Sequence, residues 1–122
     1  MSHLGRGRAA TRAALGAAGE ASVAHWYEER GYQVLARNWR CRDGELDLVV
    51  CLGRQVVFCE VKARGSDLFG APVEAVTRQK QMRIRRLAAR WLAEEAPARP
   101  RAIRFDVASV IDGGVEVLEG AF

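Results

Sequence analysis

The chain has 122 residues, a formal net charge of +4 and 49% hydrophobic residues. A chain of this size and composition forms one globular domain and has little room for a second core. No apolar run of about 18 residues occurs, and no apolar segment follows the basic N-terminus, so we expect neither a membrane-spanning helix nor a secretory signal. The three cysteines cannot all pair, and their spacing fits no common zinc site, which favours a cytoplasmic location.

Elements of the first half of the chain follow from composition and apolar periodicity. Residues 1–12 carry three arginines among small residues, which predicts a flexible basic arm. From about Ala13 to Arg30, a stripe formed by Leu15, Gly19, Val23 and Trp26 predicts a helix that ends at Gly31. Three strands then follow at residues 32–37, 45–51 and 55–62, and the polar segment 64–72 predicts a loop.

In the second half, Thr77 is typical of an N-cap, and it predicts a helix that runs to about Glu95 before Pro97 and Pro100. Two strands are expected at residues 103–107 and 115–118. The resulting order, α-β-β-β-α-β-β, predicts an α/β fold in which helices flank a mixed central sheet. We expect residues 13–122 to form this single domain.

The strands 45–51 and 55–62 predict a hairpin whose two-residue turn is Gly53-Arg54. One face then pairs Leu46 with Val61, Leu48 with Cys59 and Val50 with Val57, and is wholly apolar. The other face pairs Glu45 with Lys62, Asp47 with Glu60 and Val49 with Phe58. A slip of one residue would destroy the apolar face, which favours this register.

The predicted register sets two carboxylates, Asp47 and Glu60, directly opposite each other at ~5 Å between Cβ atoms. Like charges so placed are retained when a cation lies between them or when one carboxyl is protonated. Mg²⁺ suits one or two carboxylates together with water and phosphate. Lys62 lies on the same face, ~7 Å along the strand, where it can stabilise charge on a water or a phosphoryl group. In the alternative, Glu45 and Lys62 form a surface ion pair, and Asp47 and Glu60 form a solvated rim.

Arginine outnumbers lysine by 17 to 2, so the second lysine, Lys80, also attracts attention. Coding bias is one explanation of that ratio. At helical spacing, Lys80 lies on the core-facing stripe of the second helix and in its first turn, where a cation opposes the helix dipole. Such a position indicates function, although the side chain can also extend along the stripe to water. On the opposite face, Arg83, Arg86 and Arg90 indicate either a phosphate-binding surface or a solvated basic face.

Several motifs together resemble the YraN family of small bacterial proteins, over nearly the whole chain from about Gly16. The residues that carry this resemblance are Gly19-Glu20, Gly31-Tyr32, Asn38-Trp39-Arg40, Gly44-Glu45-Leu46-Asp47-Leu48, Phe58-Cys59-Glu60-Val61-Lys62, Lys80-Gln81 and Arg104-Phe105-Asp106-Val107. That family resembles in turn the restriction-endonuclease-like fold and, within it, the archaeal Holliday-junction resolvases.

The resemblance implies a nuclease site of the PD-(D/E)xK type. Asp47 would match the motif aspartate and Glu60-Val61-Lys62 its E-x-K, although Leu46 stands where the motif has proline. Glu20 would match an additional acidic residue of the resolvases; without the resemblance it reads equally as a solvated helix residue. The roles of Glu45 and Lys80 stay open.

These observations predict metal-dependent hydrolysis of a phosphodiester in structured or branched DNA. Asp47, Glu60 and the backbone carbonyl of Val61 would hold Mg²⁺ or Mn²⁺, Lys62 would orient or activate water, and Glu20 would complete the metal shell. Phosphates would be bound by Lys80, Arg83, Arg86 and Arg90. Two cuts in a branched substrate would suit a homodimer. The alternatives are a nucleic-acid-binding protein of the same fold without catalysis, or a protein-interaction module whose acidic hairpin is only structural.

Overall fold

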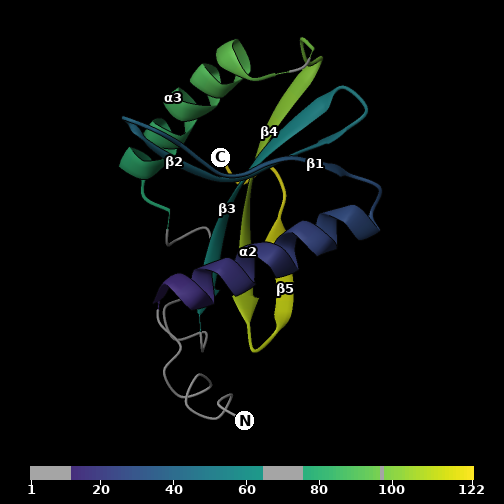
Figure 1. Ribbon diagram of the computed structural model, residues 1–122, viewed down its shortest axis with the longest axis vertical. Coiled ribbons are helices and arrows are strands. Elements are labelled where there is room, and N and C mark those ends of the chain that lie inside the picture. The colour runs from purple at the N-terminus through teal and green to yellow at the C-terminus, as the bar shows by residue number, and fades with distance from the viewer. Residues whose placement is uncertain (1–11, 65–75, 97) are drawn as a thin grey trace.

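The computed structural model describes residues 12–64, 76–96 and 98–122 (Figure 1). The predicted arm therefore lies outside the described residues except for Arg12, and the predicted loop 64–72 does so except for Arg64. The described helices are α2 (Arg12–Glu29) and α3 (Arg78–Glu94). The strands are β1 (Gln33–Cys41), β2 (Gly44–Leu52), β3 (Gln55–Arg64), β4 (Ala102–Ile111) and β5 (Gly114–Leu118). The predicted order of elements is confirmed for this part of the chain.

The five strands form one mixed sheet in the order β1-β2-β3-β4-β5. Neighbouring strands are antiparallel except β3 and β4, which are parallel over their whole length because α3 carries the chain back between them. Figure 1 shows α2 crossing one side of the sheet and α3 lying beside β2. Within the described residues, neither helix is long and apolar enough to cross a lipid bilayer.

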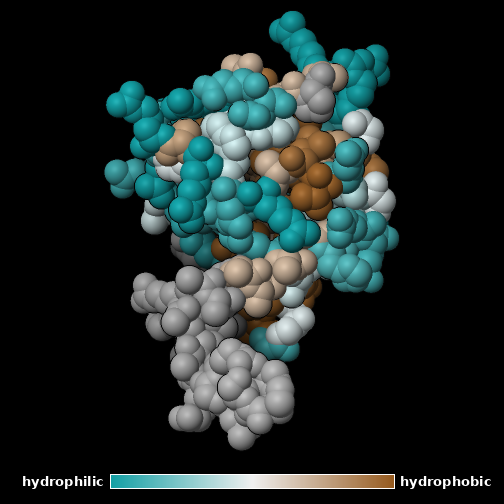
Figure 2. All heavy atoms as spheres, viewed as in Figure 1, coloured by the Kyte–Doolittle hydropathy of each residue, from teal (hydrophilic) through white to brown (hydrophobic). Residues whose placement is uncertain are grey.

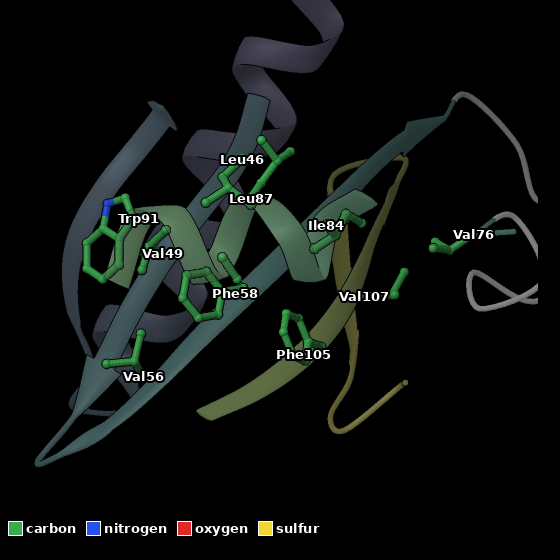
Figure 3. Packing of buried hydrophobic residues seen from close by; sticks show 11 residues of the cluster. Leu46, Val49, Val56, Phe58, Val76, Ile84, Leu87, Trp91, Phe105 and Val107 are labelled. Carbon is green, nitrogen blue, oxygen red and sulfur yellow. The ribbon is translucent and has the colours of Figure 1, made fainter. Parts of the chain in front are cut away.

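One hydrophobic cluster fixes α3 against the sheet (Figure 3). Ile84, Leu87 and Trp91 of α3 are at most 5% exposed and pack over Phe58 and Phe105 of the central strands. The rings of Phe58 and Trp91 meet edge to face with their centroids 5.8 Å apart. Thr77 caps α3 as predicted, because its hydroxyl accepts a hydrogen bond from the backbone N–H of Lys80. Lys80 is thereby fixed in the first turn of a well-anchored helix.

A second cluster packs α2 against the opposite face of the sheet. Its helix residues are Val23, Ala24 and Tyr27, and the strand residues include Leu48 and Cys59. The predicted stripe was incomplete at its end: Trp26 is half-buried and packs against this cluster, but the stripe omitted Tyr27, which is fully buried. Tyr27 continues the buried face because its hydroxyl finds a partner inside the protein, the carboxylate of Asp106.

Two strands extend four residues beyond their predicted C-terminal ends. β1 continues through Arg37 and Asn38 to Cys41, and β4 continues to Ile111. The polar residues of β1 obscured its strand pattern because β1 lies at the edge of the sheet, where one side is open to water. Trp39 is half-buried in β1 and packs against the α3 cluster.

Candidate metal and nucleic-acid site

The hairpin of β2 and β3 has the predicted register near its turn. Leu48 pairs with Cys59, Val49 with Phe58 and Val50 with Val57, so Gly53-Arg54 is the two-residue turn. Gly53 has a φ of +60°, which suits the first position of such a turn. Pairing ends at Leu48–Cys59, so the three predicted pairs beyond it, Leu46–Val61, Asp47–Glu60 and Glu45–Lys62, were wrong as backbone partners.

Asp47 lies where the two strands diverge. Its carboxylate accepts a hydrogen bond of 2.9 Å from the backbone N–H of Val61, at a point where β2 and β3 are no longer paired through their backbones. On β1, Arg37 pairs with Leu48 and Trp39 with Leu46, so Asn38 lies opposite Asp47. Asn38 has a φ of +51°. The alternation of side chains is interrupted here, so Leu46 packs in the α3 cluster and Leu48 in the α2 cluster. The predicted apolar face was therefore wrong for Leu46.

Glu60 is bound by the two lysines of the chain. Its side-chain oxygen lies 2.6 Å from the ammonium nitrogen of Lys80 and 3.5 Å from that of Lys62, while Glu60 itself is only 9% exposed. Lys80 reaches it from the first turn of α3, and Lys62 from the same face of β3. The side chain of Lys80 thus turns toward a buried carboxylate and does not simply extend to water. Glu45, predicted opposite Lys62, instead pairs with Arg40 at 3.5 Å.

A carboxylate cluster is formed by Glu20 of α2 with Glu45 and Asp47 of β2. Each offers an oxygen, and these oxygens all lie within 4.8 Å of one another. Glu20 comes so close because Gly19 lets α2 approach β3: a Cβ at Gly19 would lie 2.8 Å from that of Ala63. The sequence assigned no role to Glu45. Its position two residues before Asp47 on a strand could have indicated that the two carboxylates lie together. Glu60 lies beside this cluster but is not part of it.

The close carboxylates perturb one another. Burial, and next the charge of Glu60, raise the pKa of Asp47 to about 7, although the N–H of Val61 acts in the opposite direction. Burial also raises the pKa of Glu20, and the charge of Glu45 adds to this effect. The negative charge held at this point is therefore costly when no cation compensates it.

The two lysines respond differently to their surroundings. Burial lowers the pKa of Lys62, and the neighbouring Lys80 lowers it further. Burial acts in the same direction on Lys80, but its contacts with Glu60 and Lys62 and the charge of Asp47 together outweigh burial, so the pKa of Lys80 is raised. Lys80 is the cation that holds Glu60, and Lys62 is the lysine that gives up its proton more readily.

A cavity of about 280 Å³ opens at the carboxylates and is lined by Gly44, Glu45, Asp47, Glu60, Lys80, Arg83 and Ile84. Gly44 lets α3 lie close to the start of β2, because a Cβ there would lie 3.2 Å from a methyl group of Leu87. Two further depressions share Arg83 and Arg86 and continue along α3. Figure 2 shows that the surface over α3 is largely hydrophilic. Lys80, Arg83 and Arg86 thus border one concave path that begins at the carboxylates.

Arg90 differs from the other predicted phosphate-binding residues. Its guanidinium contacts Asp43 at 3.1 Å and Glu94 at 2.8 Å, whereas Arg83 and Arg86 are exposed and form no ion pair with the described carboxylates. Its contacts with two acidic side chains make Arg90 a weaker candidate for binding phosphate.

Sequence reasoning also missed a buried polar network behind the site. Asp106 is completely buried and accepts hydrogen bonds from Tyr27, from the backbone N–H of Gly120 and twice from Arg104. The alternation of apolar and polar residues in β4 did not predict this network, because it placed Asp106 on the polar face of the strand, where a charged residue is expected to be exposed. This network joins α2 to the sheet and so supports the helix that carries Glu20.

Fold and site together define a mixed α/β protein with a carboxylate and lysine site where two antiparallel strands diverge. A family model described as "Uncharacterised protein family UPF0102" matches residues 19–110, a range that includes every candidate site residue. The chain therefore belongs to this family, which is the YraN family that its motifs resemble.

Similar proteins come from several bacteria. A UPF0102 protein of Beutenbergia cavernae is 56% identical over 98 residues, which are 80% of this chain and 82% of the relative. One from Frankia alni is 51% identical over 114 residues, or 89% and 94% of the two chains. One from Moorella thermoacetica is 45% identical over 118 residues, or 92% and 98%. The similarity thus spans nearly the whole length of these relatives.

Proposed function

We propose that this protein is a metal-dependent endonuclease of the PD-(D/E)xK type that acts on structured or branched DNA. The observation that carries the proposal is the meeting of Asp47, Glu60 and Lys62 with Glu20 at one end of the hairpin, beside the basic path of α3. The element order and the parallel β3–β4 pair support a restriction-endonuclease-like core.

The donor set fits a divalent cation. Glu20, Glu45 and Asp47 offer three hard oxygen ligands within 4.8 Å of one another, as Mg²⁺ and Mn²⁺ prefer. The pKa of Asp47 is raised by burial and next by the charge of Glu60, and a bound cation would offset both effects. A divalent ion held there would polarise a phosphate oxygen and acidify a water molecule. Glu60 would be a further ligand, together with the carbonyl of Val61, once its oxygen is released by Lys80.

The protein's own groups supply the remaining tasks. Lys62, whose pKa burial lowers, orients a water molecule and takes or returns a proton at its amine. Lys80 holds Glu60 in place and presents positive charge at the mouth of the cavity. Arg83 and Arg86 bind the phosphates of the strand that leads away from the cleaved bond.

A second candidate is a nucleic-acid-binding protein of the same fold without catalysis. The contact of 2.6 Å between Lys80 and Glu60 favours it, because a metal ion must compete with an ammonium group for that carboxylate. The basic path along α3 would serve both functions equally well.

Cleavage of a branched substrate on two strands needs two sites, and we propose a homodimer for that reaction. We also propose that the protein acts in the cytoplasm, with which the free thiols of Cys41, Cys51 and Cys59 are compatible. Sedimentation with and without a four-way junction would show whether two copies assemble on it.

A panel of substrates separates the two functions. Four-way junction, flap, duplex and single-stranded DNA are each incubated with the protein at low salt, with Mg²⁺, with Mn²⁺ or with chelator. If the protein is a nuclease, it should cleave a structured substrate only when the metal is present. The Asp47→Asn variant should not cleave it. Binding that needs no metal and leaves every substrate intact would support the second candidate, and the absence of binding would overturn both.

A further inference from the structure

A larger cavity, of about 580 Å³, lies between the C-terminal end of α3 and the start of β4. Figure 1 shows these two ends of the elements at the top of the view. We call the cavity the α3–β4 groove; its lining residues are Leu92, Ala93, Ala96, Ala98, Arg99, Pro100, Arg101, Ala102 and Ile103. Leu92 and Lys80 are twelve positions apart on α3, which corresponds to ~18 Å along the helix axis. The groove is therefore separate from the carboxylate site.

The wall of the groove is held in place by the hairpin turn. A guanidinium nitrogen of Arg54 donates a hydrogen bond of 2.9 Å to the carbonyl of Arg99, and the backbone N–H of Arg101 donates one of 2.8 Å to the carbonyl of Arg54. The floor is equally fixed, since Leu92 and Ala96 pack against the α3 cluster. A ligand would thus enter a largely preformed groove at a low cost in ordering.

Both apolar surface and positive charge face the groove. Ile103 is 45% exposed at its edge, whereas the same strand is buried from Phe105 to Val110. The lining contains two arginines and no carboxylate, and neither Arg99 nor Arg101 forms an ion pair with any carboxylate in the described part of the chain. An apolar floor with a basic rim complements an apolar side chain flanked by acidic ones.

Among the residues that the structure describes, none pairs with part of the backbone of strand β4 at this place. β5 pairs only with Val107–Ile111, and the carbonyl of Phe105 accepts a hydrogen bond from the N–H of Ala121. Backbone groups of alternate residues point to the same side of a strand, so the N–H and C=O of Ile103 point to the same side as the carbonyl of Phe105. They lie beyond the position that Ala121 reaches. An extended segment can continue the pairing there.

We propose that the α3–β4 groove binds an extended peptide segment of a partner protein, with an aliphatic or aromatic side chain in the groove and acidic residues against Arg99 and Arg101. The backbone of the peptide pairs with β4 at Ile103. The site is distinct from the candidate nuclease site and does not depend on its activity.

Selection from a displayed library of random 12-residue peptides against the immobilised full chain tests the proposal. The expected result is enrichment of peptides with one large apolar residue flanked by Asp or Glu. Synthesised peptides should bind the wild type in a fluorescence polarisation assay and lose on the order of 10-fold in affinity for Ile103→Glu, or for Arg99→Glu combined with Arg101→Glu.

Matched variants control for effects on folding and on overall charge. Leu118→Glu replaces a residue of 43% exposure outside the groove, and Arg42→Glu combined with Arg78→Glu reverses two exposed charges outside it; both should bind the peptides as the wild type does. Thermal unfolding of each groove variant should match its control. Failure to enrich such peptides, or binding that the groove variants leave unchanged, would overturn the proposal. So would concentration-dependent dimers that Ile103→Glu dissolves, because the groove would then bind a second copy of this chain.

Discussion

The ammonium nitrogen of Lys80 lies 2.6 Å from a carboxylate oxygen of Glu60 and so links the first turn of α3 to the middle of β3. The contact explains why a cation is tolerated at the unfavourable end of a helix: the nearby buried carboxylate offsets the dipole. It also connects the element that carries the basic path to the strand that carries the E-x-K residues.

Replacement of Lys80 by methionine tests this link. We expect the free energy of unfolding to fall by about 1–2 kcal/mol, less than the usual cost of breaking a buried pair, because Lys62 remains as a partner of Glu60. Urea unfolding measures the loss, with Arg78→Met, an exposed position in the same turn, as the control. An unchanged stability would contradict a structural role for the contact, and a variant that no longer folds would show that Lys80 is a core residue.

The raised pKa of Asp47 predicts a dependence of stability on pH. The folded protein keeps the Asp47 proton up to about pH 7, whereas the unfolded chain loses it near its usual pKa of 3.8, so this residue lowers stability as pH rises between these values. Asp47→Asn keeps an oxygen to accept the N–H of Val61 but carries no charge. At pH 8 and without metal, we expect it to be about 1–3 kcal/mol more stable than the wild type.

Denaturant unfolding of both proteins from pH 4 to pH 8 measures this difference, which should shrink toward zero at pH 4. A difference that is the same at every pH would contradict the assignment of the raised pKa to Asp47. A less stable variant at pH 8 would show that its charge contributes favourably to the fold.

The basic path predicts a ranking among the arginines of α3. Arg83→Met and Arg86→Met should each weaken DNA binding and reduce the slope of log K against log salt by about one, as loss of one phosphate contact does. Arg90→Met should have a smaller effect, because its guanidinium is held by Asp43 and Glu94. Fluorescence anisotropy over a range of salt concentrations measures the slopes, with Arg101→Met, between α3 and β4, as the control. Equal effects at all four positions would argue for charge alone and against a defined path.

The network around Asp106 predicts large effects on stability alone. Arg104→Met leaves a fully buried carboxylate without its main charge partner and should cost about 3–5 kcal/mol. Tyr27→Phe removes one hydrogen bond and should cost about 1–2 kcal/mol. Thermal unfolding measures both. If Tyr27→Phe alone abolished metal binding while remaining folded, the network would have to act directly on the site.

Sequence patterns predicted most of the fold because the two helices and the hairpin obey simple periodicities. Thr77 and Gly31 mark helix ends through local chemistry, and the Leu48–Cys59 register follows from the alternation of apolar residues. The pattern failed at Asp47, where the strands diverge and alternation is interrupted. No local rule foresees that divergence, since it depends on Asn38 of a neighbouring strand and on a side-chain bond to Val61.

The candidate site, too, could be predicted only in part from the sequence. Residues of β2 and β3 were predicted to lie together from the register, but Glu20 entered only through a resemblance, because its place depends on how closely Gly19 lets a distant helix approach. Lys80 was recognised as unusual from its helix position, yet its partner Glu60 lies on another element. Tertiary distances of this kind leave no trace in the spacing of a single sequence.

The central claim, a divalent cation held by carboxylates from α2 and β2, is tested most directly by calorimetric titration of the purified protein with Mn²⁺ at pH 8. Binding at one site per chain is expected in the wild type and in Glu28→Gln, an exposed position of α2. It should be weakened in Glu20→Gln and Glu45→Gln and lost in Asp47→Asn. Unchanged Mn²⁺ binding in Asp47→Asn, or no binding by the wild type, would contradict the metal site and the nuclease function built on it.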